Sequence, residues 1–189
     1  MINKKFIQKL KTEYVKHDGE RRQIISQSNN VLHSSKRIIF ALHRGDMERA
    51  EKLLAETEEA LMALEKKFGF NRIIQEGAYK AGAEEYVEAK MYFRITAGKK
   101  VDKVIKIKLA QESYLAGICD LTGEMVRRAI NQVSKGNNKE AEEMKEAINQ
   151  IMAELVEFDF TGYLRTKYDQ ARSNLRKIEH IIYEIKIRK

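Results

Sequence analysis

The chain has 189 residues, of which 34% are charged, and it contains 10 glycines, one cysteine and no proline. A single cysteine excludes an internal disulfide framework and a zinc site built from several cysteines. No apolar run approaches the roughly 20 residues that a membrane span needs, and the first residues lack the apolar stretch of a signal peptide. We therefore expect one helical domain over residues 1–189, located in the cytoplasm and not in a membrane.

The net charge of the chain is +8, from 36 basic and 28 acidic residues. A basic protein attracts polyanions, and nucleic acid is the commonest of these. Lysine- and glutamate-rich surfaces also serve as stabilising charge networks in thermophile proteins. The charge therefore favours a nucleic-acid partner without specifying one.

Apolar residues recur at helical spacing along almost the whole chain. The first helical pattern runs from residue 3 to about 44, and the pair Asp18–Gly19 predicts a break within it. Further helices are predicted at about 47–68, 71–95, 110–134, 139–158 and 162–186. Between the helices predicted at 71–95 and 110–134, lysines interleave with valine and isoleucine, which indicates a basic loop. The pattern predicts an all-α bundle of about six to seven long helices.

Two pairs of acidic residues lie beside small or apolar residues in two of the predicted helices. Positions four apart share a helix face, so Asp120 and Glu124 stand one turn apart at the edge of an apolar stripe, with Gly117 on the same side. In the preceding predicted helix, Glu85 falls within a stripe of glycine and alanine, and Glu88 lies one turn beyond it. Small residues permit close approach of two helices, so the two pairs of acids can converge.

Converging carboxylates repel each other strongly unless a cation holds them. Their hard oxygen atoms suit Mg²⁺, with Mn²⁺ as the alternative, while the lack of histidine at ligand spacing in these helices argues against zinc and di-iron. Such an ion can generate a nucleophilic water and neutralise charge that develops on a phosphate. We predict a Mg²⁺ site formed by Glu85, Glu88, Asp120 and Glu124, and the competing interpretation is a set of solvated surface acids.

Several basic residues are candidates for contacts with the phosphates of a nucleic acid. They are Lys36, Arg37, Arg44, Arg127 and Arg128. Arg37 and Arg44 lie two turns apart on one helix face, so they can contact successive phosphates, although ordinary surface cations have the same appearance. His33 and His43 lie near this surface, but a lone histidine is more often a polar packing residue than a base. Cys119 is similarly better interpreted as a small core residue than as a nucleophile.

Four stretches of the sequence resemble the translin superfamily and occur in the same order as in that family. They are SKRIIFALHR at 35–44, EYVEA at 85–89, YLAGICDLTGE at 114–124 and KIEHIIYEIKIR at 177–188. The third is the most specific, because helix propensity alone does not dictate its glycines and acids. The likeness covers about residue 18 to the end and is stronger to translin-associated factor X than to translin proper. A segment at 98–109 that looks shorter than in factor X is typical of a compact, prokaryotic-type member.

The resemblance implies an all-α fold of about seven helices that assembles into a hollow, usually octameric, homo-oligomer. It also implies an endoribonuclease that hydrolyses single-stranded or nicked RNA inside that shell. In the factor X type, acidic residues hold Mg²⁺, and by motif they correspond to Glu85, Glu88, Asp120 and Glu124 here. Translin subunits lack this full acidic set and bind nucleic acid without cutting it. A non-catalytic binder of single-stranded RNA or DNA is therefore the alternative, and a purely structural helical scaffold is a third possibility.

Overall fold

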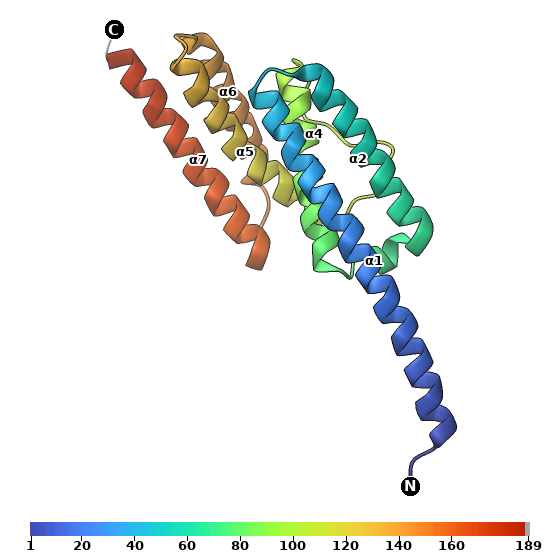
Figure 1. The fold of residues 1–189 in the computed structure, drawn as a ribbon. Helices are drawn as coiled ribbons and strands as arrows, with labels where there is room; N and C mark the ends of the chain where they lie inside the picture. Colours follow the sequence, from blue (N-terminus) through green and yellow to red (C-terminus); the bar gives the residue numbers. More distant parts are fainter. Residues whose placement is uncertain (188–189) are drawn as a thin grey trace.

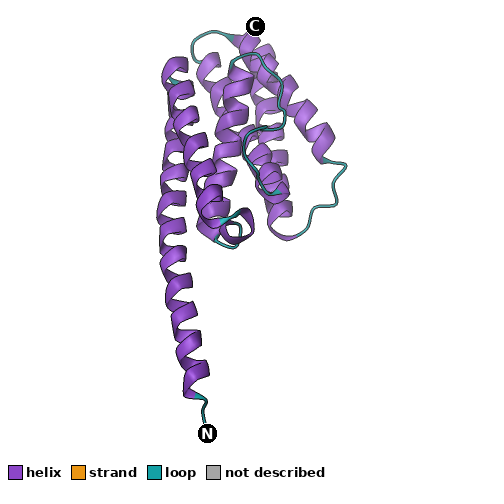
Figure 2. Ribbon diagram, turned by 90° about the vertical axis from the view of Figure 1, so that its right-hand side faces the viewer, coloured by secondary structure: helices purple, strands orange, loops and turns teal. Residues whose placement is uncertain are grey.

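The computed structural model describes residues 1–187 and shows seven α-helices and no strand in that range (Figures 1 and 2). The helices are α1 (Lys4–His43), α2 (Met47–Phe68), α3 (Phe70–Ile73), α4 (Gly77–Thr96), α5 (Gln111–Val133), α6 (Asn138–Leu155) and α7 (Gly162–Ile187). Arg188, at the end of the fourth sequence motif, and Lys189 lie outside the described residues. No helix in the described range combines the length and apolarity that crossing a bilayer requires. The all-α prediction is confirmed.

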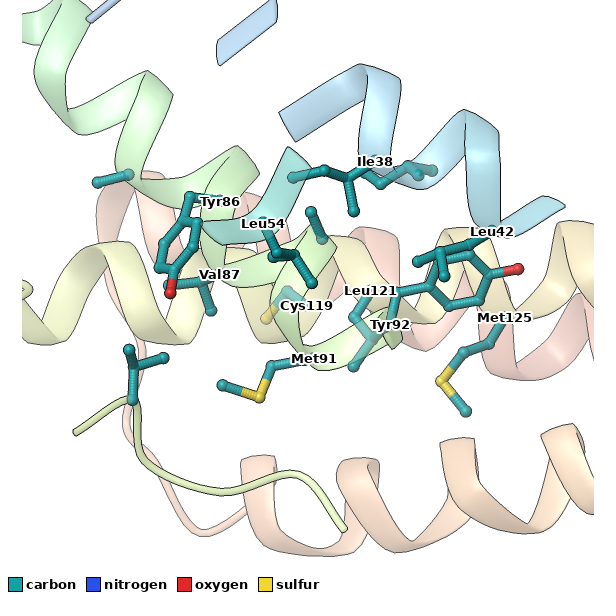
Figure 3. Packing of buried hydrophobic residues seen from close by; sticks show 14 of the residues in the cluster. Ile38, Leu42, Leu54, Tyr86, Val87, Met91, Tyr92, Cys119, Leu121 and Met125 are labelled. Atoms are coloured by element: carbon teal, nitrogen blue, oxygen red, sulfur yellow. The ribbon is translucent and has the colours of Figure 1, made fainter. Parts of the chain in front are cut away.

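The helices form two groups that meet along α4 and α5 (Figure 1). In the first group α1 packs on both α2 and α4, and in the second α5 packs on both α6 and α7. Buried side chains from both groups form one apolar cluster, in which Tyr86 and Tyr92 of α4 and Leu121 and Met125 of α5 are among the largest (Figure 3). The two helices that carry the predicted acidic pairs are therefore the central helices of the fold.

Two glycines allow α4 to pack unusually close to its neighbours. A Cβ atom on Gly117 of α5 would lie 2.7 Å from the carbonyl oxygen of Glu84 and 2.7 Å from Cβ of Val87. A Cβ atom on Gly82 of α4 would lie 2.9 Å from the carbonyl oxygen of Ser28 in α1. Only glycine fits such contacts without a shift of backbone. The small-residue stripe seen in the sequence thus sets the spacing of α1, α4 and α5.

The predicted break at Asp18–Gly19 is wrong, because α1 is one helix of 40 residues. The Asp18 carboxylate pairs with Arg22 one turn ahead at 3.1 Å, and the cost of about 1 kcal/mol for a helical glycine is too small to end so long a helix. Residues 4–17, which we call the N-terminal arm, are exposed and extend beyond the rest of the bundle (Figures 1 and 2).

The helix predicted at 71–95 is interrupted near its start. Gly69, with φ of 80°, ends α2, and a single helical turn, α3, follows before the chain turns again ahead of α4. Glu76 lies buried in that second turn, where its carboxylate accepts from Arg72 at 2.8 Å and pairs with Arg21 at 3.4 Å. These contacts hold the turn in place. The helix expected at 139–158 also ends earlier, at Leu155.

The basic loop predicted between the third and fourth long helices is present at residues 97–110. Val104 and Ile107 are its buried side chains, and the Tyr114 hydroxyl accepts from the backbone N–H of Val104 at 2.6 Å. The ammonium group of Lys108 lies over the Phe70 ring, 4.5 Å from its centroid. The loop is therefore anchored at two hydrophobic points while its lysines face outward.

Candidate functional site

The four predicted acids come from the two central helices and lie near one another. Glu85 and Glu88 extend from α4, and Asp120 and Glu124 extend from α5. Glu88 is 8% exposed, and burial raises its pKa to about 9, assisted by the charges of the other three acids. Glu88 also makes no hydrogen bond or ion pair within residues 1–187. At neutral pH this carboxyl is therefore protonated in the metal-free protein.

Glu85 is half-buried, and its carboxylate lies 3.9 Å from the ammonium nitrogen of Lys36 in α1. Burial raises the pKa of Glu85, the Lys36 charge opposes that rise, and the charges of Asp120 and Glu124 add to it. The acids of α4 and α5 thus share one electrostatic environment. The packing of α4 on α5 brings the two pairs of acids within range of each other's charge.

Two side chains of α7 complete this environment, and the sequence patterns did not point to either. The Lys167 ammonium donates to the Asp120 carboxylate at 2.5 Å, and the Tyr163 hydroxyl donates to Glu84 at 2.6 Å. Burial alone would lower the pKa of Lys167, but the hydrogen bond and charge of Asp120 raise it overall, so the side chain stays charged. Lys167 therefore neutralises one of the acids in the metal-free protein.

Glu124 has a different set of partners. Its carboxylate is bonded to Nε2 of His43, which is the last residue of α1, and lies 3.6 Å from the guanidinium of Arg127 one turn away. The His43 side chain is only 6% exposed. His43, which the sequence placed near the surface, is thus a buried neighbour of the acidic cluster.

The donor set fits a divalent cation such as Mg²⁺ in chemistry, since carboxylate oxygens are the ligands that Mg²⁺ prefers. The buried, unpartnered carboxyl of Glu88 is the observation that most calls for such an ion. Within residues 1–187, however, no three His, Cys, Asp or Glu side chains lie close enough together to hold one. Asp120 is directed to Lys167 and Glu124 to His43. Binding an ion therefore requires at least one of these acids to exchange its partner for the metal.

The profile of the translin family matches residues 19–189 of the chain. The chain belongs to the translin family. The resemblance to this family that the sequence motifs predicted is confirmed.

The relatives that this chain matches include both translin-associated protein X and translin. Translin-associated protein X of Rattus norvegicus is 26% identical over 233 aligned residues, which cover 98% of this chain and 77% of the relative. An uncharacterized protein of Methanocaldococcus jannaschii is 24% identical over 165 residues, covering 85% of this chain and 73% of the relative. Translin of Gallus gallus is 28% identical over 92 residues, which cover 48% of this chain and 40% of the relative. The alignment with translin-associated protein X therefore covers more of this chain than the alignment with translin does.

Solved structures of related proteins share the fold of this translin-family chain. The crystal structure of AfC3PO superposes with a TM-score of 0.88 at 22% identity, covering 97% of this chain and 98% of that one. A complex of AfC3PO with duplex RNA gives a TM-score of 0.86 at 21% identity, and apo-NeC3PO gives 0.85 at 23%, each covering 97% of both chains. At these identities the likeness establishes a shared fold.

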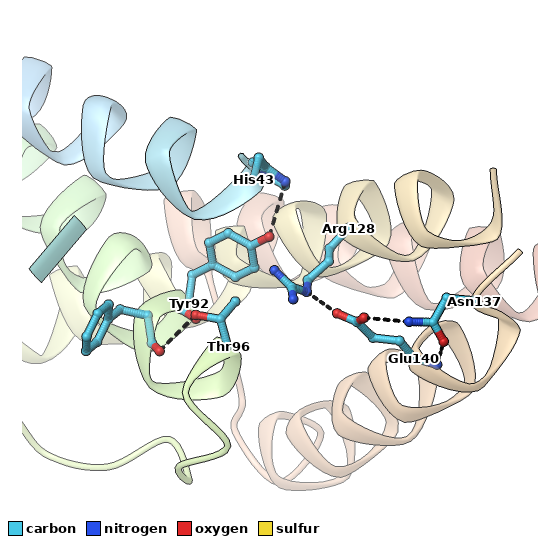
Figure 4. Close-up of polar contacts among 7 residues, drawn as sticks. His43, Tyr92, Thr96, Arg128, Asn137 and Glu140 are labelled. Carbon is cyan, nitrogen blue, oxygen red and sulfur yellow. Dashed lines mark hydrogen bonds and ion pairs between the residues drawn. The ribbon is translucent and has the colours of Figure 1, made fainter. Parts of the chain in front are cut away.

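The predicted phosphate-binding residues of this translin-family chain occupy different surroundings. Lys36 and Arg127 border the acids from α1 and α5, as described above. Arg37 is exposed and makes no ion pair within residues 1–187. The Arg44 guanidinium lies over the Phe40 ring, 4.5 Å from its centroid. Arg128 is instead held inside the fold, since its Nε donates to Glu140 of α6 at 2.5 Å (Figure 4).

Proposed function

We propose that this chain is a Mg²⁺-dependent endoribonuclease that hydrolyses phosphodiester bonds of single-stranded or nicked RNA within a homo-oligomer. The observation that carries the proposal is the buried carboxyl of Glu88, which shares the charges of Glu85, Asp120 and Glu124 and has no ion-pair partner within residues 1–187. Surface acids in the competing interpretation would be solvated and would have no reason to share a buried environment.

Each group has a role that follows from its place. Glu85, Glu88, Asp120 and Glu124 would hold the cation. When bound, Mg²⁺ supplies a polarised water and neutralises charge on the phosphate. Lys36 and Arg127 border these acids and can place a phosphate against them, while Arg37 and Arg44 on α1 can hold the next phosphates of the strand. Because Glu88 must lose its proton to act as a ligand, metal affinity rises with pH.

A nucleic-acid substrate is supported by charge and by what is known of a relative. The net charge of +8 attracts polyanions, and AfC3PO, which shares this fold, has been captured with duplex RNA. A phosphate backbone is common to duplex, nicked and single-stranded RNA, so the basic residues can serve for each of them.

Self-assembly is supported by the N-terminal arm. Phe6, Ile7, Leu10 and Tyr14 are large apolar side chains that stay exposed along it. Leu10 lies two heptads before Ile24, which is fully buried against the bundle, so the arm continues a buried stripe of α1 past the end of its neighbours. A second copy of the chain would cover this stripe. We propose a homo-oligomer, with the octamer that the family resemblance implied as its size.

The test is cleavage of end-labelled RNA in Mg²⁺ and in EDTA by the wild type and by Asp120→Asn. The variant keeps a side chain of the same size but loses a charged ligand, so cleavage should fall at least 100-fold while RNA binding and assembly stay nearly unchanged. Asp169→Asn, which removes a half-exposed acid of α7, is the matched control and should cut normally. Normal cutting by Asp120→Asn would remove that residue from the site and end the proposal.

A non-catalytic binder of single-stranded RNA or DNA is the second candidate, and one observation favours it. Asp120 and Glu124 already have partners in Lys167 and His43, so the acids are partly neutralised without a metal. Retarded but uncut RNA in both Mg²⁺ and EDTA would select this function. If neither RNA nor single-stranded DNA binds in a salt-sensitive manner, the structural scaffold is the better description.

A further inference from the structure

A chain of hydrogen bonds leads from the interior of the protein to the Glu124 carboxylate. His43 Nε2 is bonded to Glu124, and His43 Nδ1 lies 3.2 Å from the hydroxyl of Tyr92 in α4 (Figure 4). The guanidinium of Arg128 in α5 lies near enough to the Tyr92 hydroxyl for its charge to act on it. Arg128 in turn donates to Glu140 of α6 at 2.5 Å. Side chains from four helices therefore meet behind one acid of the proposed site.

The Glu124 end fixes the direction of the first hydrogen bond. A carboxylate only accepts, so Nε2 of His43 carries the proton that it donates to Glu124. At the other end, the positive charge of Arg128 favours a Tyr92 hydroxyl whose hydrogen points away from it and toward Nδ1 of His43. Tyr92 therefore holds one ring nitrogen of His43 while the other is directed at Glu124.

The surroundings keep this order in place. Tyr92 is fully buried, and burial raises its pKa to about 12, so its hydroxyl remains a donor at neutral pH. Arg128 is anchored from the other side by Glu140, which also accepts from Asn137 at 3.0 Å (Figure 4). The tilted rings of His43 and Tyr92 have centroids 5.1 Å apart, which restrains the imidazole plane.

We propose that His43 is a positioning residue, which holds the Glu124 carboxylate through its Nε2–H while the Tyr92 hydroxyl holds the other ring nitrogen. This rests on the proposed function only in that Glu124 is one of the acids that hold the cation. A bond to one carboxylate oxygen fixes the carboxylate plane and leaves the second oxygen for the ion. Outer hydrogen bonds of this kind usually change metal affinity about 10–100-fold.

The role differs from that of Lys167 at Asp120. Lys167 brings a full charge that competes with a cation for the same oxygen. His43 is itself held by Tyr92, so it brings to Glu124 a hydrogen bond whose direction is set by the fold. His33, on the same helix, is exposed and has no such partners, which makes it the natural control.

The first measurement is the tautomer of His43. The chain has four histidines, so ¹⁵N-histidine protein gives few signals in two-bond ¹H–¹⁵N correlation spectra, and loss of a signal in His43→Gln assigns that residue. We expect Nε2 of His43 to carry a proton in protein prepared without Mg²⁺, and a shifted or broadened His43 signal in Tyr92→Phe, in which nothing holds Nδ1. A wild type whose Nε2 carries no proton would overturn the inference.

The second measurement is Mg²⁺ binding by calorimetry, with folding checked by circular dichroism. His43→Leu should lower the affinity about 10–100-fold, and His43→Gln, whose amide still donates, should recover most of it. His33→Leu should bind as the wild type does. Equal losses in the Leu and Gln variants, or none in either, would overturn the inference and leave the nuclease intact. A wild type that binds no Mg²⁺ would instead overturn the proposed function, and the positioning role with it.

Discussion

Replacing Gly117 by alanine tests whether the close packing of α4 on α5 is as tight as the structure shows. The added methyl would lie 2.7 Å from the carbonyl oxygen of Glu84 and 2.7 Å from Cβ of Val87, and neither atom can rotate away. Overpacking of this kind costs about 1–3 kcal/mol, and two fixed contacts place this site at the upper end. Alanine recovers about 1 kcal/mol in helix propensity over glycine, so the net loss is about 2 kcal/mol.

Gly123→Ala on the same helix is the matched control, because its nearest neighbour, Nδ2 of Asn174, would lie 3.4 Å from the new methyl. That variant should gain up to about 1 kcal/mol from propensity alone. The two variants should therefore differ by about 3 kcal/mol, or roughly 6–12 °C in Tm for a chain of this size. Urea unfolding followed by circular dichroism in EDTA measures the difference. A Gly117→Ala protein as stable as Gly123→Ala would refute the spacing on which the acidic cluster depends.

Three further predictions follow from single side chains. Because the pKa of Glu88 is about 9 in the fold against an ordinary value of 4.5, its contribution to stability is fullest below pH 4.5 and is lost as pH rises toward 9. In EDTA, the free energy of unfolding of Glu88→Gln should therefore rise relative to that of the wild type by up to about 1.4 kcal/mol per pH unit between pH 5 and 8. If urea titrations show a difference in unfolding free energy that does not change with pH, the expectation is contradicted. Arg37→Ala should weaken RNA binding for all sequences and reduce the slope of log K against log salt by about 1 in filter-binding titrations, whereas an unchanged slope would remove Arg37 from the phosphate path. Leu10→Glu should shift light-scattering mass toward smaller species at unchanged helicity, and an unchanged mass would mean that the N-terminal arm is not an assembly surface.

The sequence predicted the fold class and the helices that carry the acids because both depend on periodicity within a single helix. The 3.6-residue repeat places Asp120 and Glu124 one above the other whatever else the chain does. The boundaries that failed depend on other parts of the molecule. The turn before α4 is held by Arg21 and Arg72 around Glu76, a contact made across helices, which no local pattern reports.

The partners of the acids were missed for the same reason. Lys167 lies 47 residues from Asp120, and His43 lies 81 residues from Glu124, so only the packing of α7 on α5 and of α1 on α4 brings them together. Arg128 was predicted to contact phosphate because it is basic and follows Glu124 by one turn. Its bond to Glu140 depends on where α6 lies. Spacing therefore placed the acids on shared helix faces, while the side chains that pair with them could be found only from the tertiary structure.

The uninterrupted course of α1 has a mechanical consequence. The N-terminal arm is at one end of this rod and His43 is its last residue at the other, with no hinge between them. If a second subunit binds the arm and tilts or twists α1, the movement would be transmitted along the helix to the His43 imidazole beside Glu124. Association of subunits would then change the orientation of the Glu124 carboxylate, which we expect to differ between an isolated and an assembled subunit.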